Sequence, residues 1–360
     1  TFAGTRRRLC ATYPGGNTEI AWHTGAYSSL LVELIPGRDT EAGGYSYREP
    51  VFVSAGCPVH RATYMLSEDN VLILDRAGYS VDGGEWEEPL DVLKIDQILR
   101  RKTGQSLATG RFRPQPWRLK REDDKAVVSL RFRVNSLTDF EGAHLGLEYP
   151  EYTEAFFNGE ALSMEPDGYF VDRAISTVKL PKIRRGSNEL VIRLRYGNMI
   201  SVEPYWILGQ FGVENDGYFN TITKLPETLC FRSITEQGFP FYGGNIRYSF
   251  DIAGGGKKYI EISKYRGAVI KVLLDGKEQG YIDFPPYRLC LGELSEGGHR
   301  VELILFATRI NTFGQLHSVY DRIPWPGPDS WRTKDRFWTD EYMLRRVGIL
   351  TAPRILTEKQ

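Results

Sequence analysis

Two short turns, each between alternating apolar residues, constrain the fold of this 360-residue chain most strongly. Asn158-Gly159 lies within YTEAFFNGEALSM, and Asp275-Gly276 lies within VIKVLLDGKEQGYI. Asn-Gly or Asp-Gly between alternating hydrophobic residues is the strongest short-range signal for a β-hairpin, because these residues accept the positive φ that the turn requires. Both stretches therefore predict hairpins.

Similar strand patterns surround the two turns in the same order. An alternating strand, VVSLRFRV, places Val128 30 positions before Asn158, and IRYSFDI places Ile246 29 positions before Asp275. A glycine-led strand follows each hairpin, RRGSNELVIRLRYG in the first case and EGGHRVELILFATR in the second. This agreement in order and spacing predicts an internal duplication of one antiparallel sandwich.

The fold class predicted from these patterns is all-β, with tandem antiparallel jelly-roll or β-sandwich domains and one short connecting helix. Alternating strands bury one face each, so they must pack as two sheets. The helix is predicted near 91–103, in DVLKIDQILRRKTG, where Val92, Ile95, Ile98 and Leu99 share one face. The expected divisions are a short β-rich N-terminal segment at 1–60, including strands in SSLLVELI and EPVFVSA, a first sandwich at 61–232 and a second at 233–360.

Charge and hydropathy exclude two classes of partner. The 46 Lys and Arg residues balance the 46 Asp and Glu residues, so the chain lacks the basic excess of a nucleic-acid-binding protein. No apolar run approaches the roughly 18 residues that suggest a membrane span. We therefore expect neither nucleic acid nor membrane as a partner.

Four separated cysteines, Cys10, Cys57, Cys230 and Cys290, give neither a zinc-ligand spacing nor a dense disulfide framework. We expect them to be reduced and buried. No local histidine pair or calcium-loop motif is present either, so the sequence predicts no metal and no cofactor.

Carboxylates are the first candidates for chemistry, because glycoside hydrolysis requires a pair of them. Glu148 and Glu151 in EYPEY, Asp172, and the neighbours Asp340 and Glu341 are present, but no spacing brings two of them together. The sequence favours solvated surface carboxylates and predicts no catalytic residue. His317, in NTFGQLHS, is the histidine of most interest, although a hydrogen-bonded loop histidine is the favoured interpretation.

Aromatic residues are the second candidates, because their rings can stack on the apolar faces of sugars. Trp325, Trp331 and Trp338 lie in the polar, proline-rich stretch PWPGPDSWRTKDRFWTDEY, and Tyr205 and Trp206 lie in EPYWILGQFG. For any single tryptophan, the favoured interpretation is that its ring closes the end of a sandwich.

Three stretches, EQGFPFYGGNIRYSF, YRGAVIKVLLDGKEQGYIDFPPYRLCLGEL and HRVELILFATRINTFGQLH, resemble the tail regions of large bacterial α-L-rhamnosidase-like glycoside hydrolases with family 2 sugar-binding-like domains. The resemblance covers roughly 60–350 and is strongest at 236–317. It implies galactose-binding-like jelly rolls, and in the loop after Pro285-Pro286 it adds Tyr287 and Arg288 to the candidate sugar contacts.

The resemblance implies a function as well as a fold. Such enzymes carry their catalytic barrel elsewhere in the chain, so we expect a non-catalytic accessory region with two partners: carbohydrate and the catalytic domain of the same enzyme. The alternatives are a self-sufficient glycosidase with an unrecognised Asp/Glu pair, and a structural interaction module without sugar affinity. The location, bacterial cytoplasm or outside the cell, is left open.

Overall fold

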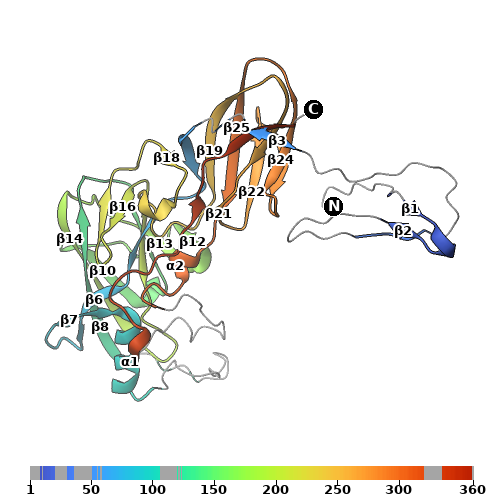
Figure 1. Ribbon diagram of the computed structural model, residues 1–360. Helices are drawn as coiled ribbons and strands as arrows, with labels where there is room; N and C mark the ends of the chain where they lie inside the picture. Colours follow the sequence, from blue (N-terminus) through green and yellow to red (C-terminus); the bar gives the residue numbers. More distant parts are fainter. Residues whose placement is uncertain are drawn as a thin grey trace.

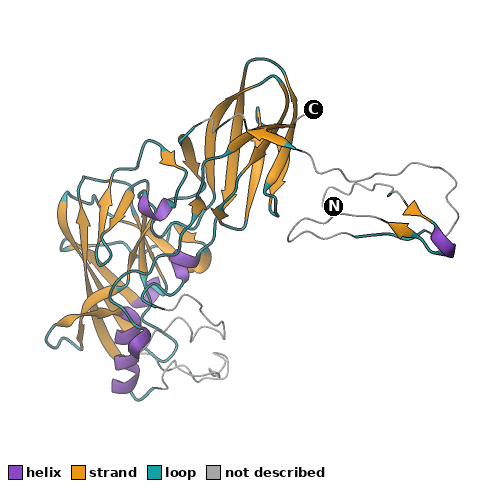
Figure 2. Cartoon of the chain, in the orientation of Figure 1, coloured by secondary structure: helices purple, strands orange, loops and turns teal. Residues whose placement is uncertain are grey.

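The structure is a computed structural model that describes residues 9, 11–20, 31–35, 51–54, 56, 59–105, 120, 122, 124–319 and 335–358. Strands dominate these residues and helices are short, as Figure 2 shows. The described strands pair antiparallel with one exception, the parallel pairing of β17 (Asn220–Thr223) with β8 (Ala126–Ser136). The predicted all-β class is therefore confirmed.

The first sandwich combines an eight-stranded and a five-stranded sheet (Figure 1). The larger sheet contains β11 (Glu160–Ala161), β10 (Thr153–Phe157), β14 (Gly186–Tyr196), β8 (Ala126–Ser136), β17 (Asn220–Thr223) and β16 (Gly212–Asn215), together with β6 (Arg76–Val81) and β7 (Glu87–Asp91). The smaller sheet contains β12 (Gly168–Phe170), β13 (Asp172–Lys179), β9 (His144–Leu147), β15 (Tyr205–Gly209) and β5 (Asn70–Leu74).

Alternation along the strands builds the first core. In β8, Val128, Leu130, Phe132 and Val134 are buried, and the residues between them are exposed or half-buried. They belong to one hydrophobic cluster with residues of the smaller sheet such as Leu145. The period of two in the sequence thus places one face of β8 against the opposite sheet.

The second sandwich combines a six-stranded and a four-stranded sheet around a separate core. The six strands are β18 (Leu229–Cys230), β4 (Arg61–Leu66), β19 (Ile246–Ala253), β25 (Gly298–Phe306), β22 (Val269–Leu274) and β23 (Lys277–Ile282). The four are β24 (Arg288–Leu294), β20 (Gly256–Glu261), β27 (Arg354–Glu358) and β3 (Phe52–Ser54).

One strand order occurs in both larger sheets. The order β11-β10-β14-β8 in the first matches β23-β22-β25-β19 in the second. The turn residues also correspond, because the side chain of Asn158 accepts from the backbone of Glu189 at 2.9 Å and that of Asp275 from Arg300 at 2.8 Å. Both turn residues have positive φ, 51° and 50°. The duplicated hairpin is therefore a repeated structural device.

Helix α1 (Val92–Lys102) forms where the sequence predicts it. The Asp91 side chain accepts from the backbone N–H of Lys94 at 3.1 Å and so caps the N-terminus. Its buried face presents Val92, Ile95 and Leu99 to the first core. With 11 residues it is the longer of the helices described, and no helix among the described residues is long and apolar enough to cross a membrane.

Short elements complete the described chain. They are β1 (Ala11–Thr12) paired with β2 (Glu19–Ile20), β21 (Tyr265–Arg266) paired with β26 (Gly348–Ile349), helix α2 (Ile310–Phe313), and single 3₁₀ turns at Pro14–Gly16, Pro150–Tyr152, Ile234–Glu236 and Asp335–Phe337.

The two sandwiches meet at α2, which lies between them in Figure 1. Phe313 of this helix packs edge-on against Trp206 of β15, with ring centroids 5.5 Å apart. The hydroxyl of Thr312 donates to the carbonyl of Phe241 at 2.8 Å, and the Arg309 guanidinium pairs with Glu68 at 2.5 Å. Apolar and polar contacts therefore both hold this junction.

Early strands pair with the second sandwich. β4 lies beside β19, and β3 lies beside β27. The expected domain boundaries at 60/61 and 232/233 stay a prediction. The strand expected in SSLLVELI is wrong for its described residues 31–35, which have no regular structure, and β3 lies within the strand predicted in EPVFVSA.

Replacing Phe132 by alanine should destabilise the first sandwich, because the side chain is buried and packs edge-on against Tyr205. We expect a loss of about 3–5 kcal/mol in the free energy of unfolding, as for other buried phenylalanines. Urea unfolding of Phe132→Ala measures it. The matched control, Arg133→Ala on the exposed face of the same strand, should change stability by less than about 0.5 kcal/mol; equal losses in both variants would contradict the assignment of the buried face.

Candidate functional site

A segment near the C-terminus of the described chain, 335–345, lies against the loop that follows α2. The backbone N–H of Thr339 donates to the carbonyl of His317 at 3.1 Å, and that of Met343 to Leu316 at 2.7 Å. A further backbone bond, from Tyr342 to Gly217 at 2.7 Å, joins the segment to the turn between β16 and β17. These bonds bring Trp338 and His317 to the first sandwich.

His317 occupies a buried polar cluster. Its side chain Nε2 lies 3.2 Å from Oδ2 of Asp75, and both residues are 4% exposed. Its Nδ1 lies 3.1 Å from the carbonyl oxygen of Thr339, and the Tyr342 hydroxyl donates to the other Asp75 oxygen at 2.7 Å. This partner set fits the favoured interpretation of His317 as a hydrogen-bonded histidine.

Burial and neighbouring charge act together on this cluster. Burial by itself lowers the pKa of His317, but the hydrogen bond to Asp75 and the charge of that carboxylate raise the pKa above 6.5. Burial, aided by the charge of Asp75, raises the pKa of Asp91 to about 6. Asp75 thus favours the protonated form of the His317 imidazole.

Trp338 covers the outer side of His317. The two rings stack with centroids 4.8 Å apart and planes inclined by 29°. The Lys94 ammonium lies 3.4 Å from the centroid of the indole, and the indole N–H donates to Asp340 at 3.2 Å. Protein groups therefore already contact much of this partly exposed ring.

Two exposed aromatic side chains stand beside this segment, in the turn between β16 and β17. Tyr218 is 46% exposed and Phe219 is 64% exposed. The Tyr218 hydroxyl donates to Oε1 of Glu341 at 2.6 Å. We call Tyr218, Phe219, Trp338, Asp340 and Glu341 the Tyr218 surface.

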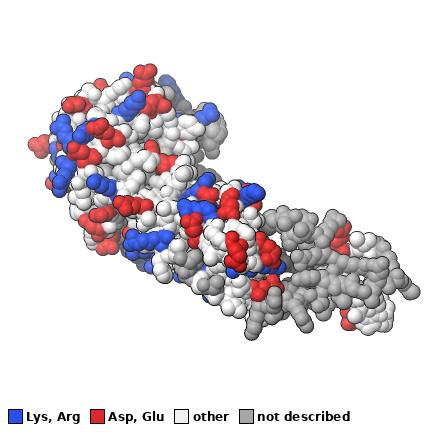
Figure 3. Space-filling model, turned by 90° about the horizontal axis from the view of Figure 1, so that it is seen from above, with Lys and Arg blue, Asp and Glu red and all other residues white. Residues whose placement is uncertain are grey.

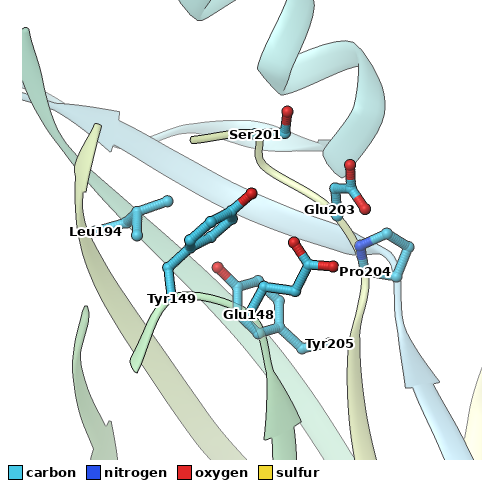
Figure 4. A pocket seen from close by; sticks show the side chains of 7 residues that line it. All are labelled: Glu148, Tyr149, Leu194, Ser201, Glu203, Pro204 and Tyr205. Atoms are coloured by element: carbon cyan, nitrogen blue, oxygen red, sulfur yellow. The ribbon is translucent and has the colours of Figure 1, made fainter. Parts of the chain in front are cut away.

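A second polar site lies below the end of α1. Glu148, Tyr149, Ser201 and Glu203 line a cavity of about 10 Å³, which has room for about one water molecule. In Figure 4 the Glu148 carboxylate and the Tyr149 hydroxyl point toward the side where the Glu203 carboxylate lies, and the Ser201 hydroxyl points away from them. The Arg100 guanidinium donates to the Ser201 hydroxyl at 2.8 Å and so reaches the edge of the cavity.

The carboxylates of this cavity influence each other. Burial, together with the charge of Glu203, raises the pKa of Glu148 from 4.5 to about 7. Glu148 is half-buried, so its expected interpretation as a solvated surface carboxylate is wrong. Glu151, from the same EYPEY motif, is exposed.

Several of the predicted sugar-contacting residues lie inside the protein. Tyr205, Trp206 and His317 are buried, and Trp206 closes the junction between the sandwiches. Trp325 and Trp331 lie outside the described residues. The structure thus brings Trp338 and His317 together, and the sugar-binding role of all of these residues stays a prediction.

Tyr287 and Arg288 lie apart from the others, in the second sandwich. Tyr287 packs edge-on against Tyr265, with ring centroids 5.7 Å apart. Arg288 forms a salt bridge with the buried Glu261 and lies 3.8 Å from the ring centroid of Phe52. Both side chains are half-buried. Their predicted role as sugar contacts also stays a prediction.

Cysteines and acidic groups form no metal site in the part of the chain that the structure describes, where no three His, Cys, Asp or Glu side chains are placed to hold an ion. Cys230 is half-buried and Cys290 is exposed, and both are free thiols. The expectation of burial is wrong for Cys290, because alternation places it on the outer face of β24. Cys10 and Cys57 lie outside the described residues.

Sequence reasoning missed Glu203 and the two aromatic residues of the β16–β17 turn. The turn carries a signal, since Asp216-Gly217 is one of four Asp-Gly pairs in the chain and two aromatic residues follow it at once, although Tyr169 and Phe170 follow Asp167-Gly168 in the same way. No signal in the sequence indicates Glu203, because this residue lies near Glu148 only through the pairing of β9 with β15 in the sheet.

Replacing Glu148 by glutamine should flatten the pH dependence of stability. Because the folded-state pKa is raised, the native state binds more protons than the unfolded state between pH 4.5 and about 7, so the native protein loses stability as pH rises through this window. Urea unfolding across pH 4–8 should show a shallower fall in Glu148→Gln than in the unchanged protein. Glu151→Gln is the control and should keep the original slope; an unchanged slope in Glu148→Gln would refute the assignment.

No family model and no curated protein matches the chain. Among solved structures it is similar to a rhamnosidase from Novosphingobium sp., with 14% identity over 72% of this chain and 26% of that chain, and a TM-score of 0.28. It is similar to a β-D-mannosidase from Dictyoglomus thermophilum, with 13% identity over 66% and 31% and a TM-score of 0.24. A GH2 β-galacturonidase from Eisenbergiella tayi gives 10% identity over 66% and 37%, with a TM-score of 0.24.

These three structures belong to glycoside hydrolases, and the chain spans between 26% and 37% of their lengths. TM-scores at this level carry no argument about the activity of this chain.

Proposed function

We propose that the chain is a non-catalytic accessory β-sandwich region of a glycoside hydrolase and that it contacts carbohydrate through the Tyr218 surface. The resemblance of 236–317 to the tail regions of such enzymes supports the affiliation. The observation that carries the proposed contact is the pair of exposed rings, Tyr218 and Phe219, next to the polar groups of Asp340 and Glu341.

The chemistry of this surface suits a sugar. A pyranose ring has apolar faces that stack on aromatic rings and hydroxyl groups that bond to carboxylates and guanidinium groups. Arg76 lies 3.7 Å from Asp340 and adds a donor beside the acidic acceptors. Contacts of this kind position a ligand without requiring any reacting group.

The carboxylate cavity supports the non-catalytic part of the proposal. A glycosidase holds the scissile bond between two carboxyl groups, with space for the sugar rings. The cavity at Glu148 and Glu203 has about 10 Å³, whereas ligand pockets have roughly 300–1,000 Å³. A glycoside does not fit between these two residues as they stand.

An exposed apolar segment supports the proposed packing on a catalytic domain. Leu31 is 97% exposed, and Leu34 and Ile35 are each 79% exposed. Large apolar side chains exposed together are typical of contact surfaces. In the proposal, the catalytic domain of the same enzyme covers them.

One observation favours a second function, that of a self-sufficient glycosidase. A carboxyl group with a pKa near 7 beside a second carboxylate has the property of a general acid at neutral pH. For this function the cavity must open far enough to admit a sugar.

The Tyr218 surface should retard the protein in a gel that contains a recognised polysaccharide. We expect Tyr218→Ala combined with Phe219→Ala to abolish the retardation, because loss of each stacking ring costs about 1 kcal/mol. Affinity electrophoresis against a panel of soluble plant and bacterial polysaccharides measures it. Tyr169→Ala, at an exposed tyrosine of β12, is the matched control and should be retarded like the unchanged protein. The proposed contact would be contradicted if the double variant were retarded as strongly as the unchanged protein, or if no polysaccharide retarded the unchanged protein.

A further inference from the structure

A groove lined by three arginines lies beside α2, apart from the Tyr218 surface. Its volume is about 560 Å³, within the range of small-molecule sites. The residues that line it are Arg266, Gly267, Thr308, Ile310, Arg345 and Arg346. No acidic side chain is among them. The groove is therefore both large enough for a small ligand and of one charge sign.

Strand pairing brings these arginines together from distant parts of the sequence. β21 pairs with β26 so that Arg266 lies opposite Gly348, two positions beyond Arg346. The buried side chain of Asn311 fixes the backbone of Arg345, accepting from its N–H at 2.9 Å and donating to its carbonyl at 2.7 Å. The backbone on this side of the groove is thus held by paired strands and by α2.

Two of the three guanidinium groups lack a carboxylate partner among the described residues. Arg266 and Arg346 are exposed and form no salt bridge within the described ranges, and Arg266 donates to the carbonyl of Tyr265 at 3.3 Å. Four other arginines of the second sandwich and the junction are, by contrast, paired with acids: Arg247 with Glu302, Arg288 with Glu261, Arg300 with Asp251, and Arg309 with Glu68.

This difference is local and does not follow from the charge of the whole protein. The chain has a formal net charge of zero, and basic and acidic side chains are mixed over the face seen in Figure 3. Unpaired guanidinium groups that converge on one groove favour planar or tetrahedral oxyanions, to which each can donate two hydrogen bonds.

We propose that this groove binds a small polyanion, with Arg266 and Arg346 donating to separate carboxylate, sulfate or phosphate groups. The Thr308 hydroxyl supplies a further donor, and Ile310 gives an apolar patch against which the ligand body packs. The proposal does not rest on carbohydrate contact at the Tyr218 surface, since the two sites share no residue.

Calorimetric titration of the whole chain with four probes tests the proposal. Trigalacturonate supplies carboxylates, a sulfated heparin disaccharide supplies sulfates, tripolyphosphate supplies phosphates, and maltotriose is a neutral control. We expect at least one anion to bind, more weakly as salt increases, with maltotriose silent. The anion that binds best identifies the source of the oxyanion groups.

Matched variants assign the binding to the groove. Arg266→Ala with Arg346→Ala should weaken anion binding about tenfold or more, because two charge-assisted contacts are lost. Arg266→Lys should weaken it less, since the charge remains, and Arg133→Ala on the first sandwich should leave it unchanged. Circular dichroism checks that each variant is folded. Absence of anion binding, equal binding by the double variant, or equal binding of maltotriose would overturn the proposal.

Discussion

The buried contact between His317 and Asp75 determines how the chain returns from the second sandwich to the first. These residues are 242 positions apart, and each lies in surroundings that exclude water. Removal of one member of such a pair leaves an uncompensated buried charge, at a cost of about 3–5 kcal/mol. Together with the backbone hydrogen bonds from Thr339, Tyr342 and Met343, this contact holds the 335–345 segment on the first sandwich.

The chain passes between the two sandwiches more than once. Early strands β3 and β4 complete the sheets of the second sandwich, and 335–345 lies on the first before β26 and β27 rejoin the second. Each core therefore requires residues from both ends of the described chain. This arrangement explains why Trp206, Asn311 and Thr312 are buried at the junction between the two cores.

Local features of the structure were predictable from the sequence, and distant ones were not. Asn158-Gly159 and Asp275-Gly276 specify turns within a few residues, and the cap and periodicity of α1 are equally local. The contact of Glu148 with Glu203, by contrast, depends on the register of separate strands, and the arginine groove depends on the pairing of β21 with β26. No spacing in the sequence encodes such meetings.

Burial separates the polar groups that hold the fold from those that are free to bind. His317 and Tyr342 satisfy Asp75 in the interior, whereas Tyr218 and Phe219 present their rings to solvent. Sequence alone treats both groups alike, as aromatic and polar residues in loops. In the proposed function, the buried groups orient a surface on which the exposed groups meet a ligand.

Hydrolysis of a panel of aryl glycosides by the folded chain alone, including an α-L-rhamnoside and a β-galactoside, tests the central proposal most directly. If the chain is a non-catalytic accessory region, it should turn over no glycoside faster than the Glu148→Gln variant does. Turnover of one glycoside that disappears in Glu148→Gln would contradict the proposal and would make Glu148 and Glu203 the catalytic pair.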